Sequence, residues 1–274
     1  MLSLRQIGSV ARVAFLEARR QGLLQLLLLG AALLVLGTRQ LREFNFGASE
    51  RRFVFDLGSG IIFGFGSILS AATVALLLFG EGGQRETMTW LAKPIGRTEW
   101  LLGRYLGAVT VIAAFSLTMT SLLAATVAVC QRDGAGGVAE GEAWSAELRF
   151  LDVAGAGLVH WLQFVVLEAL TLLIASFARS AVYTVVISLA AWTAGHFQPW
   201  LQGPPSSAPR GMLTGLAEAL TWVVPDIRSL SLEASSPEGG PLQPDAIAWL
   251  VASALLHVAG FGLLAVFTFN RRER

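Results

Sequence analysis

The chain has 274 residues, of which 54% are apolar and 14% are charged, and its mean hydropathy is +0.61. A soluble domain of this length carries more charge, so the composition indicates a protein that crosses a membrane several times. The formal net charge is +1, and the basic residues are scattered instead of forming a patch with aromatic residues, which excludes the usual pattern of nucleic-acid binding. The single cysteine, Cys130, excludes an internal disulfide, and we expect it to be a small apolar residue at a helix end.

The first predicted element is a helix within residues 1–21 that has two different faces. One face carries Leu4, Ile7, Ala11, Ala14, Phe15 and Ala18, and the other carries Arg5, Arg12 and Arg19. A basic amphipathic helix in front of a membrane span is typical of an interfacial elbow whose arginines face anionic lipid. The leader also resembles a signal peptide, but its length, its helical pattern and the lack of a clear A-x-A site predict that it is not cleaved.

Six apolar runs follow, and each is close to the roughly 20 residues that a helix needs to cross the hydrocarbon core. They are Gly22–Thr38, Leu57–Gly80, Leu101–Val129, Val153–Ala178, Ala181–Trp200 and Ala246–Asn270. The sequence therefore predicts an all-α polytopic membrane protein with six transmembrane helices in a single domain over residues 1–274.

The basic residues predict the orientation of these spans. One side of the membrane would hold Arg5, Arg12, Arg19, Arg20, Arg85, Lys93, Arg97, Arg104, Arg179, Arg271, Arg272 and Arg274. The other side, with longer loops, would hold Arg39, Arg42, Arg51, Arg52, Arg132, Arg149, Arg210 and Arg228. Because basic residues concentrate in short cytoplasmic loops, we expect both termini in the cytoplasm and the protein in the plasma (inner) membrane.

A long extracytoplasmic loop is predicted over residues 201–245. Within it, Leu213, Leu216, Ala217, Leu220 and Val224 recur at helical spacing, which predicts an amphipathic helix over Met212–Val224 along the outer surface. Two interpretations of this helix stay open: a lid packed on the ends of the spans, or part of a ligand site.

Sites for nucleotide or metal chemistry are not indicated. A phosphate loop needs Gly-Lys-Ser/Thr, but Lys93 is the only lysine and it lies between Ala92 and Pro94. The three histidines, His160, His196 and His257, lie on three different predicted spans without metal-ligand spacing, which favours roles in helix packing. On another span, Gly60, Gly64, Ser67 and Ala71 fall at a spacing typical of close helix packing. We therefore expect no catalytic residue, metal or cofactor in this chain.

Glu168 is a candidate intramembrane polar site. It lies near the middle of the predicted span Val153–Ala178, where an ionised carboxylate is expensive and must face protein, water or a cation. It can line a conduit, cap a neighbouring helix in its neutral form, or pair with an arginine or with His257. The sequence leaves these roles open.

The most specific pattern lies in the polar insert Glu81–Gly107, between the second and third apolar runs. Its charged start leads into a short amphipathic helix, which Pro94 ends because it disfavours helix at Lys93. Thr98 can then cap the helix that enters the membrane. The insert therefore predicts a rigid cytoplasmic helix that is joined directly to two spans.

This insert resembles the cytoplasmic loop of ABC-2 type transporter permeases, particularly the six-span branch that includes nitrous-oxide-reductase maturation and gliding-motility permeases. The matching residues are Glu81, Arg85-Glu86-Thr87-Met88, Leu91, Lys93-Pro94-Ile95-Gly96-Arg97 and Leu102-Gly103-Arg104. Glu86-Thr87 departs from the Gly-Thr that the family often has. The resemblance extends more loosely to the six-span layout, the leader helix and Val223-Val224-Pro225-Asp226.

The resemblance implies a membrane-spanning permease subunit of an ATP-binding cassette transporter, working as an exporter, with ATP and Mg bound by a separate cytoplasmic subunit. The implied partners are that ATPase subunit, a second permease copy or a paralogous permease, and membrane lipid. Within the coupling loop over residues 81–100, the contacts expected for the ATPase subunit are Glu81, Gln84, Arg85, Glu86, Thr87, Met88, Thr89, Trp90, Lys93, Pro94 and Arg97. The alternatives are a polar loop that only fixes topology, and a non-transporting scaffold or mechanotransmission (sensor) subunit that grips a cytoplasmic partner.

Overall fold

The computed structural model describes residues 4–44, 50–80, 96–134, 150–201, 230 and 244–271. Every regular element in these ranges is a helix, which confirms the all-α prediction for the described part of the chain. In chain order the elements are α1 (Leu4–Arg19), α2 (Gly22–Gly37), the 3₁₀ helix η1 (Thr38–Phe44), α3 (Glu50–Phe79), α5 (Arg97–Gly134), α6 (Phe150–Phe177), α7 (Ala181–Leu201) and α10 (Pro244–Arg271).

Five helical stretches in the described residues are long and apolar enough to cross a membrane: Gly22–Leu41, which continues from α2 into η1, Arg52–Phe79, Arg97–Cys130, Phe150–Phe177 and Asp245–Arg271. Helix α7 contains a shorter apolar stretch, Ala181–His196. Each of the six predicted apolar runs therefore coincides with a helix, and length and composition support five of them as spans. Helices α3 and α5 begin several residues before their apolar runs, because their more polar first turns are also helical. In α3 these turns are Glu50–Asp56, where Arg52 Nε lies 3.1 Å from Asp56 Oδ2.

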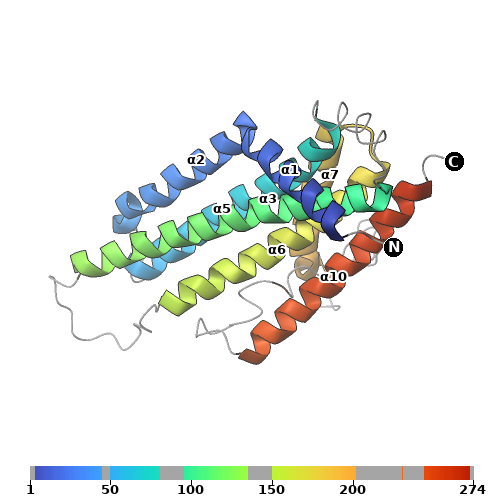
Figure 1. Ribbon diagram of the computed structural model, residues 1–274. Helices are drawn as coiled ribbons and strands as arrows, with labels where there is room; N and C mark the ends of the chain where they lie inside the picture. The colour runs from blue at the N-terminus through green and yellow to red at the C-terminus, as the bar shows by residue number, and fades with distance from the viewer. Residues whose placement is uncertain are drawn as a thin grey trace, which may run out of the picture.

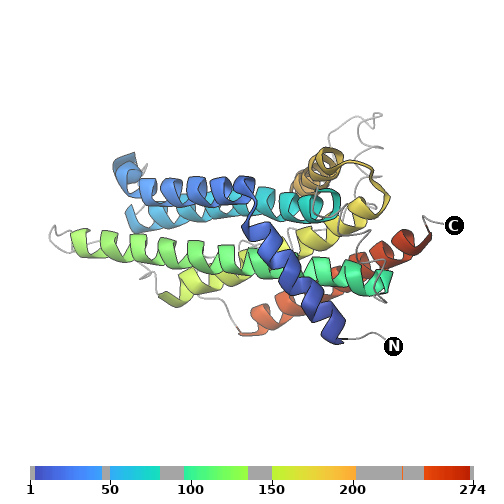
Figure 2. The ribbon, with the colours of Figure 1, turned by 45° about the horizontal axis from the view of Figure 1, so that its top comes forward.

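The long helices form an elongated bundle in which α1 crosses obliquely over α5 (Figures 1 and 2). Helix α6 is buried along most of its length, and α10 packs along it. In helices α2 and α10, by contrast, few side chains are buried. Both marked ends of the chain lie toward the end of the bundle at which α5 begins (Figure 1).

The core lies where α3, α5 and α6 meet, and its largest fully buried side chains include Ile62, Phe115 and Phe164. The ring of Phe164 occupies the space that a side chain on Gly66 would need. The predicted packing glycines Gly60 and Gly64 are instead exposed, with no atom within 4 Å of a Cβ built on either. The predicted packing face is therefore confirmed at Ser67 and Ala71, which are buried, but not at Gly60 and Gly64, because α3 turns its Gly66 side toward α6.

Candidate functional site

Most of the predicted coupling loop lies outside the described residues. This applies to Glu81, Gln84, Arg85, Glu86, Thr87, Met88, Thr89, Trp90, Lys93 and Pro94, and also to the predicted outer helix Met212–Val224. The next residue that the structure describes is Gly96. The candidate site is therefore built from the first turns of α5, the helices that meet them, and the polar side chains buried along α6.

The first turn of α5 is fixed by a bond back to the residue before it. Helix α5 begins at Arg97, which is exposed, and the backbone N–H of Gly96 donates to Glu99 Oε2 at 3.0 Å. This is the return bond of a capping box, and a carboxylate near a helix N-terminus also interacts favourably with the helix dipole. The prediction that Thr98 caps the helix is wrong, because the helix begins one residue before Thr98 and Glu99 supplies the acceptor.

Three contacts, two aromatic and one ionic, follow within the next turns of α5. Trp100 stacks on Phe269 of α10, with ring centroids 6.1 Å apart and an angle of 18° between the planes. The guanidinium carbon of Arg104 lies 5.4 Å from the centre of the Trp100 ring, and Arg104 Nη1 forms an ion pair with Glu17 Oε2 of α1. Helices α1, α5 and α10 therefore meet near the start of α5.

The Arg104–Glu17 pair is largely shielded from solvent. The side chain of Arg104 is 2% exposed and that of Glu17 is 18% exposed. Removing one partner of a buried ion pair leaves the other charge without compensation, which typically costs about 3–5 kcal/mol. Two sequence signals pointed to this pair: Arg104 lies inside an apolar run and needs a partner, and Glu17 is the single acidic residue of an otherwise basic leader.

Glycines on α5 let α1 approach closely. A Cβ built on Gly103 would lie 2.5 Å from Val10 Cβ and 3.1 Å from the Ile7 carbonyl oxygen. A Cβ built on Gly107, one turn further, would lie 2.5 Å from Ala14 Cβ and 3.0 Å from the Ala11 carbonyl oxygen. Gly-x-x-x-Gly spacing is a known way to bring helix backbones together in membranes.

The apolar face of α1 therefore packs in large part on α5. Its buried residues are Ile7, Val10, Ala14 and Ala18, whereas Leu4 of the predicted stripe is exposed. The basic residues Arg5, Arg12 and Arg19 are exposed on the other side of the helix. The two faces expected from the sequence are present, and a protein helix covers much of the apolar one.

Glu168 is fully buried on α6, and neither of its carboxylate oxygens has a hydrogen-bond partner among the described residues. The nearby Tyr105 donates its hydroxyl to the Val165 carbonyl at 3.2 Å, and not to Glu168. His257 Nδ1 lies 2.8 Å from the Ser253 carbonyl oxygen of its own helix. The alternative in which Glu168 pairs with His257 is therefore not realised in this conformation.

A chain of hydrogen bonds runs from α3 through α6 to Leu230. Ser59 Oγ is 2.8 Å from His160 Nε2, His160 Nδ1 is 3.2 Å from Gln163 Oε1, and Gln163 Nε2 donates to the Leu230 carbonyl at 3.0 Å. Since the Gln163 amide oxygen can only accept, His160 Nδ1 must carry a proton in this arrangement. The chain fastens Leu230, a fully buried residue of the predicted outer loop, to α6. The sequence assigned His160 to helix packing but did not connect it to the loop.

The Nδ1 atoms of the other two histidines, His196 and His257, each lie close to a carbonyl oxygen of their own helix. His196 Nδ1 lies 3.0 Å from the Trp192 carbonyl oxygen on α7, and its ring packs edge-on against Phe63, with centroids 5.2 Å apart. Among the described residues, no three His, Cys, Asp or Glu side chains are grouped so that they could hold a metal.

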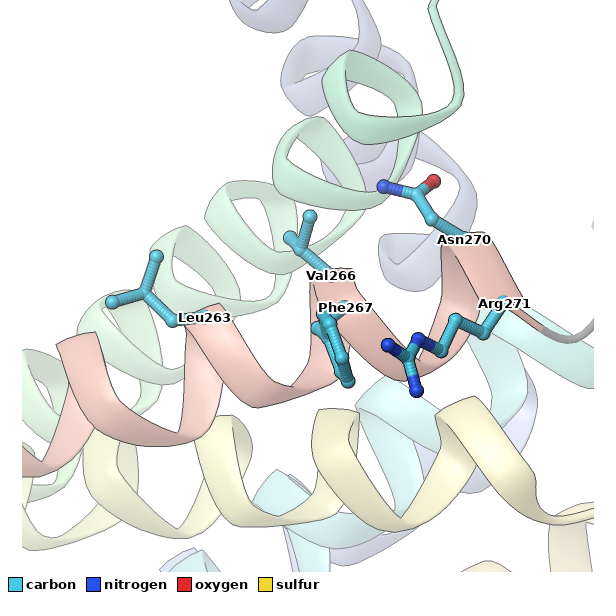
Figure 3. A pocket seen from close by; sticks show the side chains of 5 residues that line it. All are labelled: Leu263, Val266, Phe267, Asn270 and Arg271. Carbon is cyan, nitrogen blue, oxygen red and sulfur yellow. The ribbon is translucent and has the colours of Figure 1, made fainter.

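A hollow of about 650 Å³ lies beside the last turns of α10, lined by Leu263, Val266, Phe267, Asn270 and Arg271 (Figure 3). The Arg271 guanidinium carbon lies 4.1 Å from the centre of the Phe267 ring. Among the residues that the structure describes, the lining contains no acid and no nucleophile. The hollow therefore offers apolar contact and one positive charge, but no catalytic group.

The comparison with known families agrees with the geometry. No curated protein matches the chain closely. The family described as ABC-2 family transporter protein matches residues 21–274, which include every described helix from α2 to α10. A match of this extent, over an all-helical chain with several apolar helices long enough to cross a membrane, shows that the chain belongs to the ABC-2 family of transporters, as a membrane permease.

Proposed function

We propose that this permease is an export subunit that couples ATP hydrolysis by a separate cytoplasmic subunit to movement of a substrate across the plasma (inner) membrane. Membership of the ABC-2 family supports the proposal most directly. The lone, unsuitably flanked lysine Lys93 supports it further, because a phosphate loop would have to lie on another chain. ATP and Mg would then be bound by that partner.

The proposed contact with the ATPase subunit is the segment that ends at Gly96. The residues that would contact the ATPase subunit are those expected from the sequence, from Glu81 to Arg97. The capped and packed start of α5 suits this role, because a force applied just before Gly96 would meet a helix end held by Glu99, Trp100 and Arg104. A rigid joint transmits displacement, whereas a frayed helix end would absorb it.

The proposed topology has six spans with both termini in the cytoplasm, and a second permease copy or a paralogous permease completes the path. Helix α7 has 21 residues. A helix of that length extends about 31 Å, which is close to the roughly 30 Å of the hydrocarbon core. The basic face of α1 would lie toward anionic lipid at the inner surface.

The experiment is isolation of the tagged permease from its native membrane. We expect a P-loop ATPase to be isolated with it, and Glu86→Arg, or deletion of residues 87–92, to lower the ATPase activity of the complex severalfold. Glu50→Arg, the same charge reversal at an exposed position in the first turn of α3, is the control and should leave the activity close to that of the parent. An unchanged ATPase rate after both changes in the loop would contradict the coupling role. A partner without ATPase activity would fit the scaffold function instead.

Glu168 belongs to this proposal as a polar site within the membrane. The absence of a hydrogen-bond partner for either oxygen in the described structure supports it, because such a group is expensive to bury without a role. Glu168→Gln preserves the shape of the side chain and removes its ionisable proton. We expect this variant to fold normally and to lose substrate-dependent stimulation of the ATPase; full stimulation would assign Glu168 to packing alone.

A further inference from the structure

Helix α1 packs mainly on α5, and only slightly on α2 and α3. The Gly103 and Gly107 groove brings the two helices into close contact. Contacts of this kind are van der Waals contacts, which are not directional, so they alone would let α1 turn or slide on α5. The Glu17–Arg104 pair differs, because a charge-assisted bond between two defined atoms fixes both position and angle.

The C-terminal end of α1, which carries Glu17, is also tied to α2. The backbone N–H groups of Arg20 and Gln21 donate to the carbonyls of Glu17 and Ala18, both at 3.0 Å. The side-chain amide of Gln25, in the first turn of α2, donates to the Arg19 carbonyl at 3.0 Å. The turn between α1 and α2 is therefore tightly bonded, and a displacement of α1 must also displace the start of α2.

We propose that Glu17 and Arg104 are positioning residues that make α1 and the first turns of α5 move as one body. Displacement of the segment before Gly96 then reaches α2 by two joints in series, the Glu17–Arg104 pair and the Arg19–Gln25 turn. The inference rests on the proposed function, in which an ATPase subunit moves that segment. It adds a route that leads to the first membrane helix, in addition to the direct continuation of the chain into α5.

Helix α2 is suited to receive such movement. Few of its side chains are buried, and the buried ones are Leu24, Ala31 and Val35. A helix with few packed side chains shifts against its neighbours at a low cost in contacts. The route therefore ends on an element that can respond.

The first test uses the permease alone, so its result does not depend on any partner. Spin labels are placed at Ser9→Cys on α1 and Leu106→Cys on α5, both exposed, in a Cys130→Ser background in lipid nanodiscs. The variant carries Glu17→Leu together with Arg104→Leu, because replacing both members of a buried pair with apolar residues leaves no orphan charge and preserves folding. Arg52→Leu together with Asp56→Leu, which removes an exposed ion pair on α3, is the matched control.

We expect the double-leucine variant at least to double the width of the Ser9–Leu106 distance distribution, and the control to leave it unchanged. If the double-leucine variant has the same distance distribution as the control, the proposal that the Glu17–Arg104 pair holds α1 on α5 is overturned. A Glu17→Asp variant, which keeps the charge on a shorter side chain, should fall between the parent and the double-leucine variant.

The second test uses the permease isolated with its ATPase, in the presence of ATP and vanadate. Labels at Leu29→Cys on α2 and Leu264→Cys on α10, both exposed, report movement of α2. We expect trapping to shift this distance in the parent, and at least half of the shift to be lost in the double-leucine variant while ATP hydrolysis continues. An equal shift in the parent and in the double-leucine variant would overturn the route through α1, but not the proposed function. If trapping does not shift this distance in the parent, the route to α2 is overturned; the proposed function, which also has the direct continuation of the chain into α5, is tested separately by the ATPase rate of the Glu86→Arg variant.

Discussion

At the scale of single residues, the contact between α1 and α5 depends on two positions that have no side chain. Gly103 and Gly107 lie one turn apart on α5, opposite Val10 and Ala14 of α1. Their missing Cβ atoms let Glu17 come within bonding reach of Arg104, which is itself nearly without solvent contact. The buried Glu17–Arg104 ion pair therefore depends on the close packing that Gly103 and Gly107 allow.

Gly103→Val tests this arrangement. The new side chain would overlap Val10 and the Ile7 carbonyl, and neither a β-branched residue on a helix nor a backbone carbonyl can move aside easily. We expect a loss of about 1–3 kcal/mol in stability, as is typical of overpacking. The measurement is thermal unfolding in detergent. Gly8→Ala is the control: Gly8 is exposed with nothing near its Cβ position, so replacing it should leave stability equal or slightly higher. Equal melting points for Gly103→Val and the parent would contradict the close contact.

At the scale of elements, a buried polar chain connects the core to the segment between α7 and α10. Gln163 has a central position in it, because its amide oxygen accepts from His160 and its amide nitrogen donates to Leu230. Leu230 also packs among Val159, Leu162, Val166 and Trp192, so this residue is held by apolar contacts as well. The polar chain fixes the orientation of a backbone group that the apolar contacts would leave free to rotate.

Gln163→Leu should loosen Leu230 without opening the core. The leucine keeps a similar volume, but it leaves the His160 Nδ1–H and the Leu230 carbonyl without partners, a change worth about 1–3 kcal/mol for each buried group. With Leu230→Cys in the Cys130→Ser background, we expect labelling by a membrane-impermeant maleimide to become about tenfold faster, which corresponds to about 1.4 kcal/mol. Thr171→Val on the same helix is the control, since the Thr171 hydroxyl donates only to Leu167 of α6. Equal labelling rates in Gln163→Leu and the control would show that apolar packing alone holds Leu230.

At the scale of the whole molecule, the sequence predicted which segments are helical much better than it predicted their contacts. Apolar length locates the helices, because crossing a membrane demands a run of a certain length whatever lies beside it. The pair Glu17–Arg104 joins residues 87 positions apart, and Gln163 binds Leu230 across 67. Periodicity within one helix carries no information on such pairings. It assigned Gly60 and Gly64 to packing for the same reason: spacing shows which residues share a face, but not which face meets a neighbour.

The number of membrane crossings decides on which side of the membrane the C-terminus lies. Among the described helices, α7 is the one whose crossing is undecided by length and composition. If α7 crosses the membrane, the spans number six and the two termini share a side; if it does not, the five others place them on opposite sides. The start of α1 and the end of α10 lie toward the same end of the bundle (Figure 2), as expected for an even number of crossings. We therefore expect single cysteines at Ser9→Cys and Arg274→Cys, in the Cys130→Ser background, to react with an impermeant maleimide only in inside-out vesicles. Val138→Cys and Ser235→Cys should react only from the outside of intact cells. Labelling of Arg274→Cys from the outside, with Ser9→Cys labelled from the inside, would mean that α7 does not cross, and that the segment after it is cytoplasmic.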